Sequence, residues 1–397
     1  MPPKKEELVS LDLFSGIAGI TKALQGICLP AAYCDVSESS QVTISRLMEK
    51  QKIPNAPICP DIALLDKRWL KRHTKHKHID ILVAGFPCIG FSSVGSRKGF
   101  GNSQSSLFSH IIRLIDETDC PLVFLENVPN ILNLGMAFIA SELSEKRGFE
   151  LRWTIVSARD VGAPHKRDRW FCFGIRRPVH VVPPKVQHAY KLYPWSDAKT
   201  EREPPRLQLH MTARQVQQLA LLGNSVVPDA VRYAFFMLVM PKNVTSLDTP
   251  RELKLCLASP AHHTNSGTFV LPRQYPRNGV LHRNGKLVKM PPVRPLLTMP
   301  KRELLFDPSV FRSLKEPSHM LTSDYIDKPV KAHAWSTPRF GNTMACNYLT
   351  RRSIRDLPTQ IRFEVKSSAA WKLRQHGKMS PAFVEYLMGY PIGWTDL

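Results

Sequence analysis

Residues 8–26 read LVSLDLFSGIAGITKALQG, and this stretch decides the fold. The apolar run 8–14 predicts a buried strand, the glycines that follow predict a turn, and the pattern beyond them predicts a helix through about Leu24. A turn through Gly16 and Gly19 lets the backbone approach a bound ligand closely. The spacing is not the full GxGxxG, and no phosphate-loop lysine follows, so a nucleoside ligand without a pyrophosphate fits better than NAD.

Strand-like and helix-like segments alternate from about residue 8 to residue 240. Further apolar strands are expected at 31–36, 79–84, 121–125, 151–157 and 169–176. Strands that alternate with helices favour an α/β fold with a parallel, doubly wound sheet. Such a sheet binds ligands beyond the carboxyl ends of its strands.

Two carboxylates follow the second and third expected strands. Asp35 lies about 20 residues beyond the glycine turn, where an acidic side chain can accept hydrogen bonds from ribose hydroxyls. Asp61, in CPDIALL, is placed to receive an adenine amino group. The alternative interpretation of both residues is an ordinary loop carboxylate.

A cysteine stands in GFPCIGFSSVG (85–95), directly after the apolar run 79–84. Proline, glycine and serine around Cys88 predict a polar loop, whereas a cysteine that packs as a small hydrophobe belongs inside an apolar element. An exposed thiol whose thiolate is favoured is a nucleophile. We therefore interpret Cys88 as a displayed nucleophile.

Three further segments place polar groups at strand ends or turns. Glu126 ends an apolar strand in FLENVPNIL, where it either bonds the next turn or contacts a heterocycle held against Cys88. Arg167 and Arg169 alternate on one face as another strand begins, ready to pair with phosphates or to hold a loop. The segment 221–236, LLGNSVVPDAVRYAFF, predicts a polar turn followed by an amphipathic helix.

The composition indicates a globular protein with a polyanionic partner. Lys and Arg number 55 against 33 acidic residues, a formal charge of +22, and such an excess favours nucleic acid. The eight cysteines form no CxxC pair, which argues against a zinc or disulfide framework. The opening MPPKKEELVS lacks the apolar core of a signal peptide, and no apolar run is long enough to span a bilayer. We expect a soluble, intracellular protein of the nucleus or cytoplasm, with no metal and no membrane contact.

The chain changes character after Pro241. Residues 241–397 carry 24 Lys and Arg against 11 Asp and Glu, and residues 1–240 carry 31 against 22. Prolines and short basic segments are interleaved with apolar runs in the second part. We expect a domain at 1–240 that binds the small ligand and a smaller, irregular β-rich domain at 241–397 that faces the polyanion.

Five segments in this order resemble the DNA (cytosine-5)-methyltransferase family. LDLFSGIAG is similar to its S-adenosylmethionine loop, GFPCIGFSSVG to its Pro-Cys motif and FLENV to its Glu-Asn-Val motif. GAPHKRDR and GNSVVP are similar to its arginine-pair and Gly-Asn-Ser-Val motifs, although His165 stands where Gln is usual. Residues 335–363 and the closing LMGYPIGW resemble the smaller enzymes of chlorella viruses.

The resemblance implies a Rossmann-like S-adenosylmethionine-dependent methyltransferase sheet at 1–240 and a target-recognition domain at 241–397. It implies transfer of a methyl group to C5 of a flipped cytosine in duplex DNA, in a short GC-containing site, by a monomer. The catalytic residues would be Cys88, Glu126, Arg167 and Arg169, the last two holding the flipped nucleotide. The cofactor site would comprise Phe14, Gly16, Asp35, Asp61, Pro87, Leu107, Asn224 and Val226. The candidate DNA contacts are Ser92, Arg97, Lys98, Arg351, Arg352 and Arg355.

Three other functions stay open on sequence alone. An RNA (tRNA) cytosine methyltransferase could use the same scaffold. A non-catalytic, DNA-binding relative would have no need for Cys88, Glu126 and Arg167 together. An NAD-linked enzyme is disfavoured by the glycine spacing. The arginines at 351–355 are also open to a simpler interpretation as a solvated surface.

Overall fold

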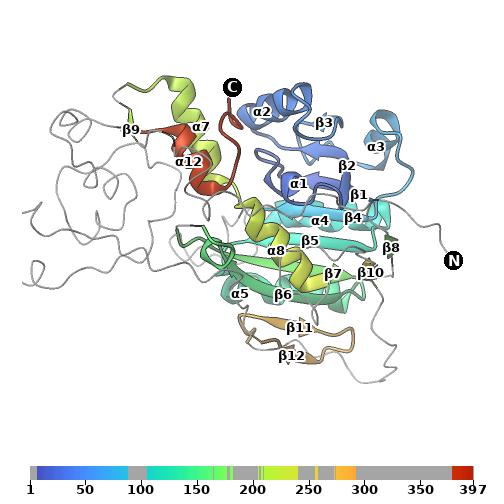
Figure 1. Ribbon diagram of the computed structural model, residues 1–397. Coiled ribbons are helices and arrows are strands. Elements are labelled where there is room, and N and C mark those ends of the chain that lie inside the picture. The colour runs from blue at the N-terminus through green and yellow to red at the C-terminus, as the bar shows by residue number, and fades with distance from the viewer. Residues whose placement is uncertain are drawn as a thin grey trace, which may run out of the picture.

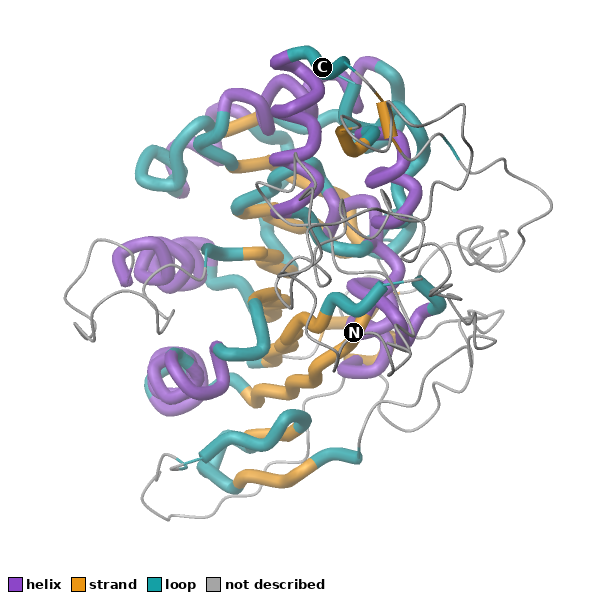
Figure 2. Tube along the Cα trace, turned by 90° about the vertical axis from the view of Figure 1, so that its left-hand side faces the viewer, coloured by secondary structure: helices purple, strands orange, loops and turns teal. Residues whose placement is uncertain are grey.

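The computed structural model describes residues 7–87, 105–163, 165–176, 179–181, 204, 207–208, 210–239, 255–257, 272, 274–291 and 378–396. Within these residues the principal sheet has nine strands in the order β12-β11-β6-β7-β5-β4-β1-β2-β3. Helices cover both of its faces (Figures 1 and 2). This arrangement confirms the expected α/β class.

The first five strands run parallel to one another. They are β1 (Leu8–Leu13), β2 (Cys28–Cys34), β3 (Ile58–Cys59), β4 (Ile81–Gly85) and β5 (Leu122–Asn127). Parallel pairing joins β1 to both β2 and β4, β2 to β3, and β4 to β5. Their carboxyl ends therefore meet at one edge of the sheet, and the motif residues after β1, β2, β4 and β5 converge there.

The sheet is mixed, whereas the sequence pattern favoured a parallel one. Strand β7 (Asp168–Ile175) is inserted between β5 and β6 (Glu150–Ser157) and runs antiparallel to both. The connection from β6 to β7 is a single 3₁₀ turn (Ala158–Val161) and a short loop. A parallel return needs a crossover of a dozen or more residues, so this short connection forces the reversal.

Helices lie on both faces of the sheet, and side chains alternate between two hydrophobic clusters along each strand. One face is covered by α1 (Gly19–Ala23), α2 (Glu38–Glu49), α7 (Ala213–Asn224), α8 (Pro228–Val239) and α12 (Pro381–Met388). The other face is covered by α3 (Lys67–His73), α4 (Ser105–Thr118), α5 (Ile131–Leu134) and α6 (Met136–Ala140), which a π-helical turn (Ser141–Glu145) extends. Every helix among the described residues is too short or too polar to cross a membrane.

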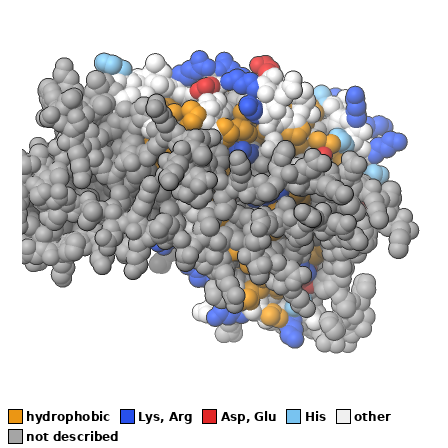
Figure 3. Space-filling model, viewed as in Figure 1, with side chains coloured by type: hydrophobic (Ala, Val, Ile, Leu, Met, Phe, Trp, Pro, Cys, Tyr) orange, Lys and Arg blue, Asp and Glu red, His pale blue; other side chains and the backbone are white. Residues whose placement is uncertain are grey.

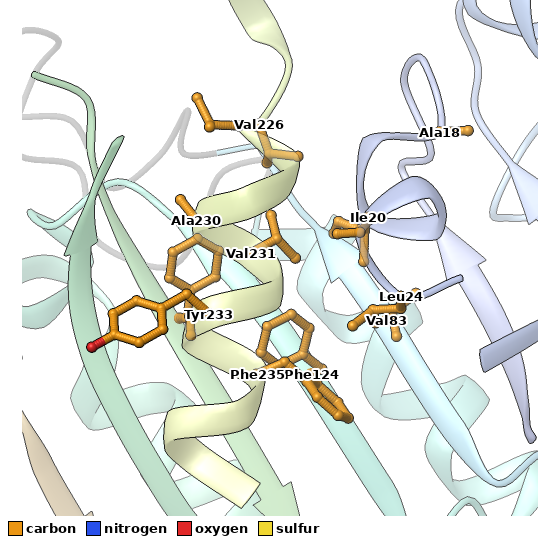
Figure 4. Packing of buried hydrophobic residues seen from close by; sticks show 14 of the residues in the cluster. Ala18, Ile20, Leu24, Val83, Phe124, Val226, Ala230, Val231, Tyr233 and Phe235 are labelled. Carbon is orange, nitrogen blue, oxygen red and sulfur yellow. The ribbon is translucent and has the colours of Figure 1, made fainter. Parts of the chain in front are cut away.

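Helix α8 is the most deeply packed helix of the described structure. Its Phe235 is fully buried and makes edge-to-face contacts with Phe124 of β5 and Phe173 of β7, at ring-centroid distances of 5.3 and 5.8 Å. Figure 4 shows Phe235 beside Phe124 at the base of the helix, with Val226 at the opposite end. The helix thereby fixes the turn before it against the sheet.

The described residues beyond 240 pack on the first part of the chain. Strand β11 (Gly279–Leu281) pairs with β6 and with β12 (Leu287–Lys289), and β13 (Lys378–Met379) pairs with β9 (Leu207–Gln208). A small ladder joins β8 (Val179–Val181) to β10 (Leu255–Leu257). Pairing of β11 covers the otherwise open edge of β6. Strands β11 and β12 therefore extend the nine-stranded sheet, and the division into domains at 1–240 and 241–397 stays a prediction.

Candidate active site

The turn between β1 and α1 has an unusual backbone. Phe14, Gly16 and Ala18 all adopt positive φ angles, of 54°, 54° and 57°. Two of them carry side chains that disfavour this conformation, a strain that is typical of functional turns. A Cβ at Gly16 would meet no atom within 4 Å, so glycine serves the backbone conformation and leaves open space beside it. The hydroxyl of Ser15 donates to the carbonyl of Asp12 at 2.8 Å and holds the turn closed.

Asp35, just beyond β2, ties this turn to the next helix. Its Oδ2 accepts a hydrogen bond from the Gly16 amide at 2.8 Å, and its Oδ1 accepts one from the Ser37 amide at 2.9 Å. A carboxylate has about four acceptor positions, so lone pairs remain for a ligand hydroxyl. Asp61 instead turns back on its own loop, where its Oδ1 accepts from the Ala63 amide at 2.8 Å.

A cavity of about 600 Å³ opens at the carboxyl edge of the sheet. It is lined by seven of the residues expected from sequence: Phe14, Gly16, Asp35, Pro87, Glu126, Arg169 and Asn224. Asp61, Leu107, Arg167 and Val226 are outside its lining. The sequence motifs therefore form one site, but not every residue in them faces the cavity.

The cavity suits a nucleoside cofactor in size and chemistry. Its volume lies in the usual range for small-molecule sites, which are mainly apolar with a few polar groups. Phe14 and Val36 supply apolar surface, and Val36 is 80% exposed in spite of its aliphatic side chain. Asp35 supplies the acceptor. Val36 was missed because an aliphatic side chain so close to the end of β2 resembles a core residue in sequence.

Glu126, at the end of β5, and Asp35, just beyond β2, both supply carboxyl groups to the lining of the cavity. Glu126 is 8% exposed, and its Oε1 lies 3.0 Å from Arg169 Nε. Burial raises the pKa of Glu126 above its usual range, although Arg169 and Arg167 act in the opposite direction. A Cβ at Gly85 would lie 3.1 Å from Glu126 Oε2, so glycine at this position leaves room for the carboxyl group.

Arg167 takes a different place from its neighbour. It was expected to hold a flipped nucleotide, but it is only 4% exposed and its Nη2 donates to the carbonyls of Gly223 and Ser225, at 3.0 and 2.6 Å. A buried guanidinium needs such acceptors, and the turn before α8 provides them. Arg167 therefore contacts that turn and Arg169 lines the cavity, while the role of both arginines in holding a flipped nucleotide stays a prediction.

Asn127 lines the cavity and was not among the residues expected from sequence, although it belongs to the FLENV segment. It is 2% exposed, and its Nδ2 donates to the carbonyl of Phe86 at 3.1 Å. Its Oδ1 accepts from the Val128 amide at 2.8 Å. Asn127 thus fixes the backbone just before Pro87. The feature of the sequence that could have revealed Asn127 is an amide side chain at the end of an apolar strand.

Several expected residues lie outside the described ranges. Cys88 follows Pro87 directly but is not among the described residues, and the same holds for Ser92, Arg97, Lys98, Arg351, Arg352 and Arg355. Leu107 lies in α4 and packs against the second hydrophobic cluster. Among the described residues there is no group of three or more His, Cys, Asp or Glu side chains that could hold a metal ion.

Comparison with known proteins identifies the family. The model of the C-5 cytosine-specific DNA methylases matches residues 8–234. The chain is 28% identical over 386 residues to the type II methyltransferase M.CviJI of Paramecium bursaria Chlorella virus IL3A, and the match covers 96% of each chain. It is 31% identical over 182 residues to M.MspI of Moraxella sp, covering 44% of this chain and 40% of that one, and 28% identical over 174 residues to M.HhaI of Haemophilus parahaemolyticus, covering 43% and 50%. Because the family model matches more than half of the chain, this protein belongs to the C-5 cytosine-specific DNA methylases and is a DNA (cytosine-5)-methyltransferase that uses S-adenosylmethionine.

Proposed function

We propose that the protein methylates C5 of a cytosine flipped out of duplex DNA, through a covalent adduct with Cys88, in a short GC-containing site. One observation carries the proposal: a single cavity joins the Asp35–Gly16 turn, the Glu126–Arg169 pair and Pro87, the residue directly before Cys88. A cofactor wall and a wall that can hold a base thus face the same space.

The chemistry needs a nucleophile because cytosine C5 does not attack a methyl group unaided. The Cys88 thiolate adds to C6, and the π electron pair of the C5=C6 double bond shifts onto C5 and is delocalised through C4 onto N3, which Glu126 binds together with the exocyclic amine. S-adenosylmethionine supplies an electrophilic methyl group on a sulfonium. The electron-rich C5 would take that methyl group as the methyl–sulfur bond breaks and S-adenosylhomocysteine leaves. Loss of the C5 proton to a base and elimination of the Cys88 thiolate would then restore the aromatic ring.

Glu126 is suited to the base-binding step by its surroundings. Its raised pKa brings the carboxyl closer to carrying a proton at neutral pH, and a protonated carboxyl can donate to N3. Arg169, at 3.0 Å, fixes the orientation of the carboxyl. The pair therefore stabilises the negative charge that the thiolate brings into the ring.

The target base has to leave the duplex to reach this cavity. Flipping costs a few kcal/mol in unstacking and unpairing, which contacts in the pocket offset. We assign the base to the side of Glu126 and Arg169, and the cofactor to the side of Phe14, Gly16 and Asp35. Phe14 would stack on the adenine and Asp35 would accept the ribose hydroxyls. Pro87 and Asn224 complete the walls between them.

The positive charge of the chain supports binding to the DNA backbone. Lys and Arg side chains are prominent on the described surface in Figure 3, and the whole chain carries +22. If the protein makes about six to ten phosphate contacts, raising the salt concentration from 50 to 200 mM lowers its affinity for DNA by about 10³- to 10⁵-fold. Ser92, Arg97 and Lys98 are proposed contacts near the flipped base. Arg351, Arg352 and Arg355 are proposed DNA contacts in the target-recognition domain. We further propose that the protein acts as a monomer, in the nucleus or cytoplasm of a host cell.

The target is tested by transfer of labelled methyl groups from S-adenosylmethionine to duplexes that contain GC, CG or neither dinucleotide. We expect label in the GC duplex alone. Label in the CG duplex alone would overturn the target but keep the enzyme. Label in tRNA, with none in any duplex, would overturn the DNA substrate and favour the RNA methyltransferase.

A further inference from the structure

The last residues of the chain lie directly behind the walls of the cavity. The C-terminal segment, residues 380–396, comprises α12 and the turns after it, and Tyr390 and Trp394 are 0% and 4% exposed. In Figure 1, α12 lies beside α7, and the chain then runs back toward α1 and α2. This segment is separated by well over a hundred residues from every wall that it contacts.

Two side chains of the segment hold the backbone of two cavity walls. Trp394 Nε1 donates to the carbonyl of Ile17 at 2.9 Å, in the strained turn after β1. The Tyr390 hydroxyl donates to the carbonyl of Val226 at 2.9 Å, directly after Asn224 and Ser225, which line the cavity. A Cβ at Gly19 would collide with that hydroxyl and lie 2.7 Å from Val226 Cγ2, so the two walls and Tyr390 meet without free space.

The C-terminal segment also forms hydrogen bonds with α7, with α2 and with the loop before β7. Gln218 of α7 donates to the Thr395 carbonyl at 2.9 Å, and its neighbour Gln217 lines the cavity. Arg46 of α2 donates to the Asp396 carbonyl at 3.3 Å. His165, kept neutral because burial lowers its pKa to about 3, donates from Nε2 to the Leu387 carbonyl at 2.9 Å. Through these contacts the segment is bonded to three separate parts of the chain.

The segment is itself held in one shape. Glu385, 2% exposed, accepts hydrogen bonds from the Gly393 amide, the Thr395 amide and the Thr395 hydroxyl, at 2.7, 2.7 and 2.6 Å. Gly389 and Gly393 take positive φ angles of 77° and 80°, which let the chain turn twice. A carboxylate that organises three donors fixes Tyr390 and Trp394 relative to each other.

We propose that the C-terminal segment is the back wall of the cofactor site, and that Trp394 and Tyr390 are positioning residues that hold the 14–19 turn and the 224–228 turn at the spacing S-adenosylmethionine requires. Neither side chain lines the cavity. They act on the cofactor through the carbonyls of Ile17 and Val226. Loss of either hydrogen bond releases a wall, so it weakens cofactor binding more than it slows methyl transfer once the cofactor is bound.

The test compares Trp394→Phe with Trp153→Phe in the full-length protein. Trp153 is the matched control because it is also buried, at 0% exposed, and its Nε1 also donates to a backbone carbonyl, that of Pro276, at 2.9 Å. It lies in β6 and outside the cavity lining. The readouts are calorimetric affinity for S-adenosylhomocysteine without DNA, and the midpoint of thermal unfolding. Trp394→Phe leaves the Ile17 carbonyl without its donor. If the free energy of that one hydrogen bond is lost from cofactor binding, the affinity for S-adenosylhomocysteine falls about five- to tenfold.

We expect Trp394→Phe to bind S-adenosylhomocysteine about five- to tenfold more weakly and Trp153→Phe to bind it normally, with similar decreases in unfolding midpoint. Equal affinities for the two variants would overturn the proposal. If Trp394→Phe does not fold, the same comparison is made with Tyr390→Phe, which removes one oxygen. Its control is Tyr33→Phe, because the Tyr33 hydroxyl also donates to a backbone carbonyl, that of Pro54, at 2.9 Å. Because the readout is binding without DNA, failure of the Cys88 mechanism leaves this result unaffected.

Discussion

The Glu126→Gln variant is expected to transfer methyl groups about 10²- to 10⁴-fold more slowly than the intact protein. Glutamine keeps the shape of the side chain but has neither the negative charge that pairs with Arg169 nor a carboxyl proton for the base. The rate is measured in a single turnover with enzyme in excess over a duplex that contains the target. Affinity for S-adenosylhomocysteine should change little, because Glu126 is assigned to the base side of the cavity.

Glu150→Gln is the matched control for this prediction. Glu150 is 1% exposed and its Oε1 lies 2.8 Å from Arg152 Nε, so it is also a buried carboxylate paired with an arginine. It lies on β6 and outside the cavity lining. If Glu150→Gln slowed the single turnover as much as Glu126→Gln, the effect would reflect general destabilisation, and the role assigned to Glu126 would be wrong.

Phe235→Ala is expected to lower the free energy of unfolding by about 3–5 kcal/mol, because it removes a fully buried ring and leaves a cavity under α8. The ring contacts Phe124 and Phe173 on two different strands, so neighbouring side chains have little freedom to fill the space. Urea unfolding followed by circular dichroism measures the change.

Val216→Ala on α7 provides the comparison for Phe235→Ala. Val216 is 42% exposed, and an exposed substitution of this kind usually changes stability by no more than about 0.5 kcal/mol. A loss below about 1 kcal/mol for Phe235→Ala would be smaller than the usual range for such a deletion. It would contradict the central packing role assigned to α8.

Most strands of the nine-stranded sheet could be predicted because each is a short apolar run bounded by polar or turn-forming residues, whereas β11 and β12, of three residues each, were not predicted. Strands β1, β4, β5 and β6 lie within a few residues of their expected positions. The direction of β7 could not be predicted from periodicity, since alternation of side chains is the same for parallel and antiparallel strands. The shortness of the 158–167 connection was the available signal.

The candidate site could be predicted as a set of motifs, but not residue by residue. Arg167 and Arg169 share one face of a strand start, and only burial shows that the first binds a turn and the second pairs with Glu126. Tyr390 and Trp394 were missed for another reason. Their hydrogen-bond partners are 164 and 377 residues away in sequence, and no local pattern encodes such a contact.

The covalent step can be observed with a duplex that carries 5-fluorocytosine at the target position, incubated with the protein and S-adenosylmethionine. Fluorine at C5 cannot leave as the proton does, so an adduct formed at C6 persists. Cys28, Cys34, Cys59, Cys120 and Cys172 are buried, and burial raises the pKa of Cys120 to about 12, so these five thiols are poor nucleophiles at neutral pH. We expect a denaturant-resistant protein–DNA complex whose linked peptide contains Cys88, and no complex with Cys88→Ser. A complex linked through another residue, or methylation of normal DNA by Cys88→Ser at the intact rate, would contradict the mechanism.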